Sequence, residues 1–193
     1  MSPRIVAFDL GGVVVDVDHG VLADLGPAEL VDHAFFGEAR HDALTIGDLD
    51  EVAFIAAAAD VLGVDPGSVA DRWRRVVRFS DGGFALVHAA ARTVPVAVWS
   101  NTDPLHWLVL GPALESVASS VATSFRLRCQ KPDPIFFLRA LQGLHVAPHE
   151  VLFLDDRVDN VESARDLGID AVVCRGVEAA RSILRERGLP VDT

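Results

Sequence analysis

Six residues of this sequence carry side chains that could act together in phosphate chemistry: Asp9, Ser100, Asn101, Lys131, Asp155 and Asp156. Three carboxylates brought together repel one another unless a divalent cation or an ammonium group neutralises them. Oxygen ligands in small number suit Mg²⁺, which keeps water molecules and shares its coordination with a substrate phosphate. Hydroxyl, amide and ammonium groups are suitable donors to phosphate oxygens, and an aspartate can form an acyl phosphate. The set predicts a site for Mg²⁺ and a small phosphorylated substrate.

The first of these residues, Asp9, ends a short apolar run at residues 5–8. A run of this length is typical of a buried parallel strand, and open α/β sheets place their ligands at the carboxyl ends of such strands. Gly11 and Gly12 follow at once, and they allow the backbone to turn sharply and come close to whatever Asp9 holds. A carboxylate here can be a nucleophile, a metal ligand or both, whereas a loop aspartate is the alternative interpretation of this stretch alone.

Other apolar runs precede the remaining candidates. Residues 94–99 lead to Ser100, and residues 151–154 lead to Asp155. Lys131 is the only lysine among 17 basic residues, and it stands just before a helix that an Asp-Pro pair opens. Because the loops after parallel strands face one crevice, we expect these side chains to meet there.

The chain alternates between strand and helix outside one block. Strands are expected at 5–8, 94–99, 122–125, 151–154 and 171–173, with helices between them. This alternation predicts an α/β fold with a doubly wound, Rossmann-like parallel sheet. We predict an α/β core from residues 1–17 and 83–193, and an inserted helical cap from residues 18–82.

Within the cap block we expect helices and no strand. Asp48 is expected to cap a helix that ends at Leu62, and Asp65 with the following proline is expected to open the next helix. Residues 13–17 alternate loosely, which suggests a short hairpin or flap before the cap begins.

Composition limits the class of partner. The formal net charge of −11 argues against nucleic acid and anionic membranes, whose binding needs basic patches, although a small anion can still find a local positive site. No apolar stretch approaches the ~20 residues of a membrane helix, and the chain enters its first strand without a signal-like segment. Cys129 and Cys174 form no metal or disulfide pattern, so we expect reduced thiols in a cytoplasmic protein. The sequence does not indicate an oligomeric state.

Four motifs in order resemble those of the haloacid dehalogenase-like hydrolases, and they span nearly the whole chain. The motifs are FDLGGV at 8–13, VWSNT at 98–102, QKPDPIF at 130–136 and FLDDRVDN at 153–160. The family also carries a cap after its first motif, which matches the helical block. The resemblance implies Asp9 as the nucleophile, Ser100 and Asn101 as phosphate ligands, and Lys131 as the neutralising cation. It also implies a Mg²⁺ site formed by Asp9, the Gly11 carbonyl, Asp156 and Asp155.

One departure from the family is Gly11. Most phosphatases of the family have an aspartate there, acting as general acid and then as general base. Its loss should slow catalysis by roughly 10²–10⁴-fold without forbidding it. Asp16, Asp18 and His19 are the candidates to replace it. The sequence also resembles a subgroup with Leu-Gly-Gly or Leu-Gly-Asn at this site, some of which hydrolyse sugar phosphates.

Two other functions stay open. Gly11 favours a binding or regulatory protein of the same fold with weak or no turnover. A dehalogenase, whose aspartate attacks carbon without a metal, is disfavoured by the acidic pair Asp155-Asp156, because those charges would raise the pKa of the Asp9 carboxyl.

Several other polar and aromatic residues have more than one interpretation. Asp159 and Asn160 either cap a helix or support the metal site. Residues 40–42 are expected in a solvated loop, with contact to the substrate as the less favoured interpretation. The arginines of 72–78 are expected on a solvated face. The three tryptophans, at 73, 99 and 107, are expected to pack in the interior.

Overall fold

A computed structural model describes residues 3–191, so the outermost two residues at each end of the predicted core lie outside the described part. Five parallel strands form one sheet in the order β5-β4-β1-β6-β7. Their bounds are β1 (Ile5–Phe8), β4 (Val96–Ser100), β5 (Ser120–Thr123), β6 (Val151–Asp155) and β7 (Asp170–Val173). Each predicted strand is present, although the one expected at 122–125 ends at Thr123, because α7 (Ser124–Leu127) begins at the next residue. The predicted doubly wound α/β fold is confirmed.

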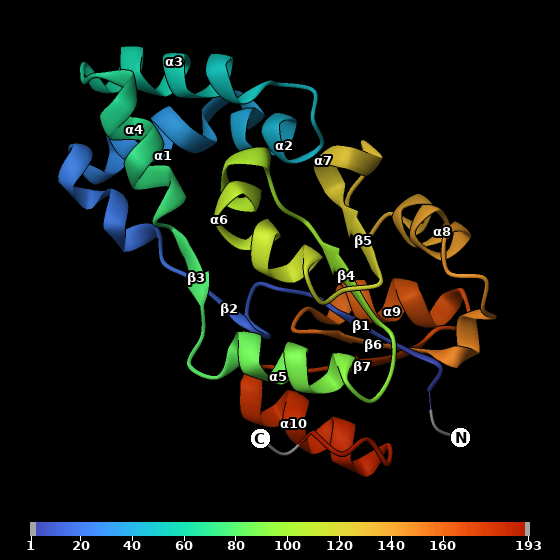
Figure 1. The fold of residues 1–193 in the computed structure, drawn as a ribbon. Helices are drawn as coiled ribbons and strands as arrows, with labels where there is room; N and C mark the ends of the chain where they lie inside the picture. Colours follow the sequence, from blue (N-terminus) through green and yellow to red (C-terminus); the bar gives the residue numbers. More distant parts are fainter. Residues whose placement is uncertain (1–2, 192–193) are drawn as a thin grey trace.

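Side chains of the sheet alternate between two apolar layers. In the central strand β1, Val6 and Phe8 join one buried cluster, while Ile5 and Ala7 join the other. The helices over the first layer are α5 (Gly83–Ala91), α6 (Pro104–Glu115) and α10 (Val177–Glu186), and those over the second are α8 (Pro134–Gln142) and α9 (Val158–Asp166). Figure 1 shows α5 and α10 on the opposite side of the sheet from α8 and α9. With both faces covered, the strand ends are the exposed edge on which a site can form.

A second sheet of two strands joins the start of the chain to the end of the helical block. β2 (Val15–Val17) pairs antiparallel with β3 (Val77–Phe79). The flap expected at residues 13–17 is therefore present, but its strand β2 pairs with a distant segment and does not form a local hairpin. The prediction of no strand within residues 18–82 was wrong, because β3 acquires its hydrogen bonds from a segment 60 residues earlier and has no local signal of its own.

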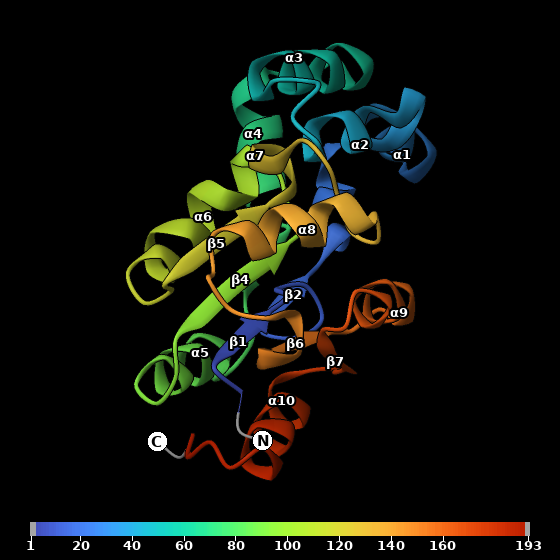
Figure 2. The ribbon, with the colours of Figure 1, turned by 90° about the vertical axis from the view of Figure 1, so that its right-hand side faces the viewer.

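The block between β2 and β3 is helical, as expected. It comprises η1 (His19–Leu25), α1 (Ala28–Phe36), η2 (Gly37–Ala39), α2 (Arg40–Thr45), α3 (Glu51–Leu62) and α4 (Pro66–Arg74). Figures 1 and 2 show α1 to α4 gathered beyond one end of the sheet, next to α7 (Ser124–Leu127). A last short turn, η3 (Pro148–Glu150), precedes β6.

Helix starts follow the predicted capping in one case and differ in another. Asp65 accepts a hydrogen bond from the Ser68 N–H and caps α4, as predicted. Asp48 does not cap α3, because Asp50 accepts from the Ala53 N–H instead. Asp48 pairs with Arg128, which lies 80 residues further along the chain.

A buried polar junction connects the helical block to the core. Trp73 of α4 is fully buried and stacks on His106 of α6, with ring centroids 4.9 Å apart. Asp103 caps α6, and its Oδ2 atom lies 2.7 Å from His106 Nδ1. His106 Nε2 lies 2.9 Å from the Trp73 carbonyl oxygen, so both ring nitrogens of His106 face an acceptor. The predicted packing of Trp73, Trp99 and Trp107 in the interior is confirmed.

Within residues 3–191, no single helix has the length and apolar composition needed to cross a membrane, and only α3 and α4 taken together, bent by 112°, meet that test. Cys129 and Cys174 are both free.

Candidate active site

Asp9 lies directly beyond β1, where its N–H continues the sheet by donating to the Leu154 carbonyl at 2.9 Å. Its side chain is buried, with 7% of the residue exposed. The turn after it depends on Gly12, which has a φ of +69° and on which a Cβ would stand 2.6 Å from Asp156 Oδ2. Gly12 is therefore required for Asp156 to approach Asp9. The Gly11 carbonyl stays outside the hydrogen bonds of this turn, which use the Leu10 carbonyl and the Gly12 N–H.

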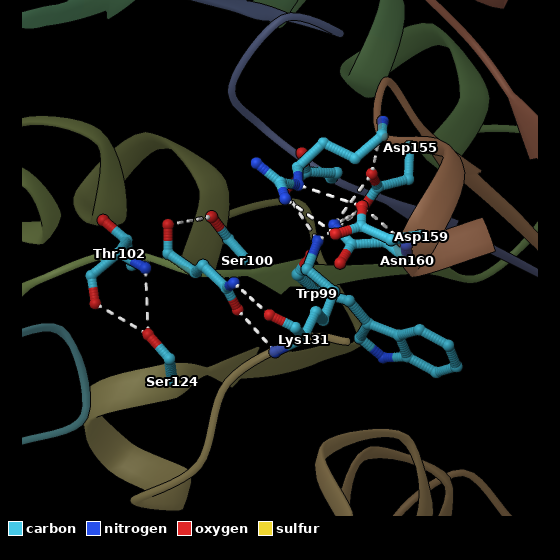
Figure 3. Close-up of polar contacts among 11 residues, drawn as sticks. Trp99, Ser100, Thr102, Ser124, Lys131, Asp155, Asp159 and Asn160 are labelled. Atoms are coloured by element: carbon cyan, nitrogen blue, oxygen red, sulfur yellow. Dashed lines mark hydrogen bonds and ion pairs between the residues drawn. The ribbon is translucent and has the colours of Figure 1, made fainter. Parts of the chain in front are cut away.

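Lys131 holds the centre of the site. Its Nζ lies 2.9 Å from Asp9 Oδ1 and 2.7 Å from Asp155 Oδ2, and it also donates to the Trp99 carbonyl at 2.8 Å. Figure 3 shows its side chain directed toward Asp155 and Asn160. Only 3% of the residue is exposed. All three protons of this ammonium have a protein acceptor, so Lys131 is fixed between the two carboxylates.

Asp155 is fully buried, and its oxygens are fully engaged. Apart from Lys131, it accepts from the Arg157 N–H at 2.9 Å and from Asn160 Nδ2 at 3.0 Å to each oxygen. Asn160 thus supports the acidic pair, which was one of the two interpretations of this residue. Asp159 instead forms an ion pair with Arg157 on the surface, at 2.7 Å.

The three carboxylates lie close together, so their mutual repulsion must be offset by positive charge. Asp9, Asp155 and Asp156 offer one oxygen each within 4.8 Å of one another. Burial raises the pKa of the Asp9 carboxyl to about 6; the charge of Lys131 opposes the increase and that of Asp155 adds to it. Burial, followed by repulsion from Asp155, also raises the pKa of Asp156. One ammonium does not compensate three carboxylates, and hard oxygen donors at this spacing fit a divalent cation such as Mg²⁺.

Lys131 was one of three residues predicted to bind phosphate. The other two, Ser100 and Asn101, lie beside the carboxylates but are not equivalent. Asn101 holds the loop of Lys131, because its Nδ2 donates to the Lys131 carbonyl at 2.8 Å and its Oδ1 accepts from the Lys131 N–H at 2.9 Å. Ser100 ends β4 and is buried. In Figure 3, Ser100 lies between Thr102 and Trp99 on this strand end. Neither residue caps the helix that follows, because Asp103 caps α6.

A cavity of about 990 Å³ opens over the strand ends. Five of the seven predicted site residues line it: Asp9, Gly11, Asn101, Lys131 and Asp156. Asp155 is enclosed behind them. Ser100 borders a smaller cavity of about 140 Å³, which shares Gly11 and Asn101 with the large one.

The helical block supplies several residues to the large cavity. Thr45 of α2 and Arg78 of β3 were not predicted to lie there, whereas substrate contact was the less favoured interpretation of His41 and Asp42 of α2. Asp16 and Asp18 were expected only as possible acids. The expectation that residues 40–42 form a solvated loop was wrong, because they belong to α2 and two of them face the cavity. Arg40 donates to the carbonyls of His33 and Ala34. No local pattern distinguishes these side chains from surface residues, so only packing could place them.

Fold and site together define an α/β protein with a carboxylate-rich pocket at its strand ends. The sequence matches the family model of the haloacid dehalogenase-like hydrolases over residues 3–168. The chain belongs to this family and is a hydrolase.

Two proteins of known activity are similar in sequence. The chain is 23% identical over 182 residues to the D-ribitol-5-phosphate phosphatase of Bacteroides thetaiotaomicron, covering 86% of this chain and 88% of the relative. It is 32% identical over 63 residues to flavin mononucleotide hydrolase 1 of Arabidopsis thaliana, which is 33% of this chain and 26% of that protein.

Solved structures share the fold. A haloacid dehalogenase-family enzyme of Bacteroides thetaiotaomicron, in complex with magnesium and inorganic phosphate, has a TM-score of 0.79 at 19% identity, covering 88% of this chain and 93% of its own. A predicted hydrolase of the family from Porphyromonas gingivalis has a TM-score of 0.80 at 22% identity, with coverages of 96% and 99%. The L-2-haloacid dehalogenase of Xanthobacter autotrophicus has a TM-score of 0.64 at 22% identity, with coverages of 97% and 84%.

Proposed function

We propose that this protein is a Mg²⁺-dependent phosphatase that hydrolyses a small phosphorylated metabolite, such as a sugar phosphate, through an aspartyl-phosphate intermediate on Asp9. The observation that carries the proposal is the group of three carboxylates around one buried lysine, at the edge of the sheet where ligands bind. The activities of the two named relatives, both on small phosphorylated compounds, support it.

The residues present fit Mg²⁺. Asp9, Asp156 and the Gly11 carbonyl would hold the ion directly, with Asp155 beside them. When bound, Mg²⁺ neutralises the phosphate charge that would otherwise repel the three carboxylates. Asp9 is then ionised and attacks phosphorus in line, while Lys131 keeps its carboxylate oriented and offsets the developing charge. Water subsequently releases phosphate from Asp9.

Residues 18–82 act in this proposal as the cap that closes over the substrate. The side chains of α2 and β3 in the large cavity support this role, since they face the same space as Asp9. A cavity of about 990 Å³ accommodates a small metabolite and leaves room for ordered water. Closure of such a cap would exclude bulk water from the reaction.

The test is a hydrolysis assay on p-nitrophenyl phosphate and a panel of sugar phosphates, with Mg²⁺ or with a chelator. Wild type should turn over at least one substrate, and both chelation and Asp9→Asn should abolish turnover. Absence of turnover in folded, Mg²⁺-binding protein would instead favour a binding role for the site. Release of halide from a 2-haloacid in the presence of chelator would favour the dehalogenase.

A further inference from the structure

The described site provides a nucleophile and a cation but no obvious proton donor. Transfer of the phosphoryl group to Asp9 leaves an alkoxide on the departing group, which needs a proton to leave readily. Lys131 has no proton to spare, because all three of its N–H bonds point at acceptors. Gly11 has no side chain. A proton donor must therefore come from elsewhere around the cavity.

The three candidates named from the sequence do not fit this role. Asp16 is held as an anion by Arg78 at 2.8 Å and by the Ser80 hydroxyl at 2.5 Å, and the Ser80 hydrogen bond in particular keeps its pKa low. Asp18 accepts from the Gly20 N–H and caps η1. His19 borders the smaller cavity and a further one within the helical block, but not the cavity that contains Asp9.

His41 of α2 is differently placed. It lines both cavities, and so does Gly11, so the two residues stand on the boundary that the two spaces share. Phe36 and Trp73 pack edge-on against its ring, with centroid distances of 5.3 and 5.5 Å, and fix its position. One ring nitrogen, Nε2, lies 3.5 Å from the Thr45 hydroxyl, a distance at which the hydrogen bond is weak. Across residues 3–191 no protein hydrogen bond is found for the other ring nitrogen, so the imidazole is free to serve a ligand.

We propose that His41 is the proton-transfer residue of this site, an inference that rests on the proposed phosphatase function. In the first step the bond between Asp9 and phosphorus forms, the bond between phosphorus and the leaving oxygen breaks, and that oxygen takes a proton from the His41 imidazolium. In the second step water attacks phosphorus and gives a proton to the neutral imidazole. The bond from Asp9 to phosphorus then breaks, and phosphate leaves.

The surroundings of His41 are compatible with both steps. Burial lowers its pKa; Asp103 and Asp42 oppose this effect, while His106 and His19 add to it. The imidazole is therefore neutral in the free protein at neutral pH. A phosphate dianion that enters the cavity favours the charged imidazolium, so His41 gains its proton as the substrate binds.

Substrates with different leaving groups distinguish proton donation by His41 from a purely structural role. Loss of a general acid harms a poor leaving group much more than a good one. For His41→Gln we expect kcat/KM to fall by about 100-fold on phenyl phosphate and by less than about tenfold on p-nitrophenyl phosphate, whose leaving group needs little protonation. His19→Gln is the matched control, since it alters a neighbouring histidine outside the large cavity and should leave the ratio of the two substrates unchanged.

A second variant tests the position itself. Among the described residues, a Cβ on Gly11 would meet Val17 Cγ2 alone, at an ordinary 3.5 Å, so the position admits a side chain at its first atom. Gly11→Asp in the His41→Gln background should restore phenyl phosphate turnover by at least about tenfold and change p-nitrophenyl phosphate turnover little. Recovery of this kind would show that a proton donor at the shared boundary is what His41 supplied.

Two results would overturn the assignment of His41. One is an equal loss of kcat/KM by His41→Gln on both substrates, which would indicate that His41 only shapes the cavity. The other is no loss of kcat/KM on either substrate. Each leaves the phosphatase proposal intact, because wild-type turnover would still require Asp9 and Mg²⁺. Wild-type protein without Asp9-dependent turnover on either substrate would overturn the phosphatase proposal itself.

Discussion

Asp9→Asn should abolish turnover and, in the absence of metal, make the protein more stable at neutral pH. The physical reason is that the carboxylate is ionised in a place that disfavours its charge. Burial raises the pKa of Asp9 from 3.8 to about 6, even though Lys131 lies 2.9 Å away and opposes the increase. An uncharged amide of the same shape avoids this cost and can still accept a hydrogen bond from Lys131.

The magnitude follows from proton linkage. Between pH 3.8 and about 6 the folded protein binds more protons at Asp9 than the unfolded chain does, so this group lowers stability as the pH rises through that window. At about 1.4 kcal/mol per pKa unit, the full cost above this window is about 3 kcal/mol. We expect the stability advantage of Asp9→Asn to grow by about 2 kcal/mol from about pH 4.5 to about pH 8.

Urea unfolding of wild type and Asp9→Asn in a chelating buffer measures this difference. Asp16→Asn is a useful control of opposite sign, because the Ser80 hydrogen bond and Arg78 lower the pKa of Asp16. Its carboxylate adds stability that is lost as the pH falls, so the amide should not stabilise. Added Mg²⁺ should stabilise wild type and have a much smaller effect on Asp9→Asn. The reasoning is refuted if Asp9→Asn is the less stable protein at pH 8, or if the gap does not change with pH.

Three further predictions follow from the site and from the buried junction. Gly12→Ala forces a Cβ to within 2.6 Å of Asp156 Oδ2 at a φ of +69°, and should weaken Mg²⁺ affinity at least about tenfold by calorimetry. Gly143→Ala, where nothing lies within 4 Å, is its control, and equal affinities would contradict the geometry. Asp103→Asn should cost about 3–5 kcal/mol in urea unfolding, because it removes the buried carboxylate charge and turns one of two oxygens that both accept hydrogen bonds into a donor. Burial raises the pKa of Asp103, but hydrogen bonds and charge from His106 outweigh it and keep the pKa low, so its contribution in wild type is lost only as the pH falls below 3.8. An unchanged urea midpoint for Asp103→Asn would show that Asp103 does not stabilise the buried junction. Removal of Mg²⁺ by a chelator should stop turnover reversibly, and activity that persists would refute metal dependence.

Much of the site could be predicted because its residues follow local signals. Apolar runs fixed the five strands, and a polar residue directly after such a run must lie at the edge of the sheet. Asp9 and Asp156 could therefore be placed in one pocket from spacing alone. Lys131 needed an additional argument, its being the only lysine, because it does not follow a strand.

Capping was predicted well where one candidate existed and poorly where two did. Asp65 precedes a proline, which is favoured at the first position of a helix, and it caps the helix that follows. Asp48 and Asp50 are chemically equal candidates two residues apart. The choice between them depends on Arg128, which engages Asp48 from a distant part of the chain.

The sequence by itself determined the order of the strands along the chain, the helical block and the residues at the strand ends. These features depend on periodicity and capping within short windows. Tertiary structure alone decided that β3 pairs with β2, that Asn160 and not Asp159 supports Asp155, and that His41 lines the large cavity with Asp9. Contacts of this kind join segments many residues apart, and their formation depends on how whole helices and strands pack, which no local pattern specifies.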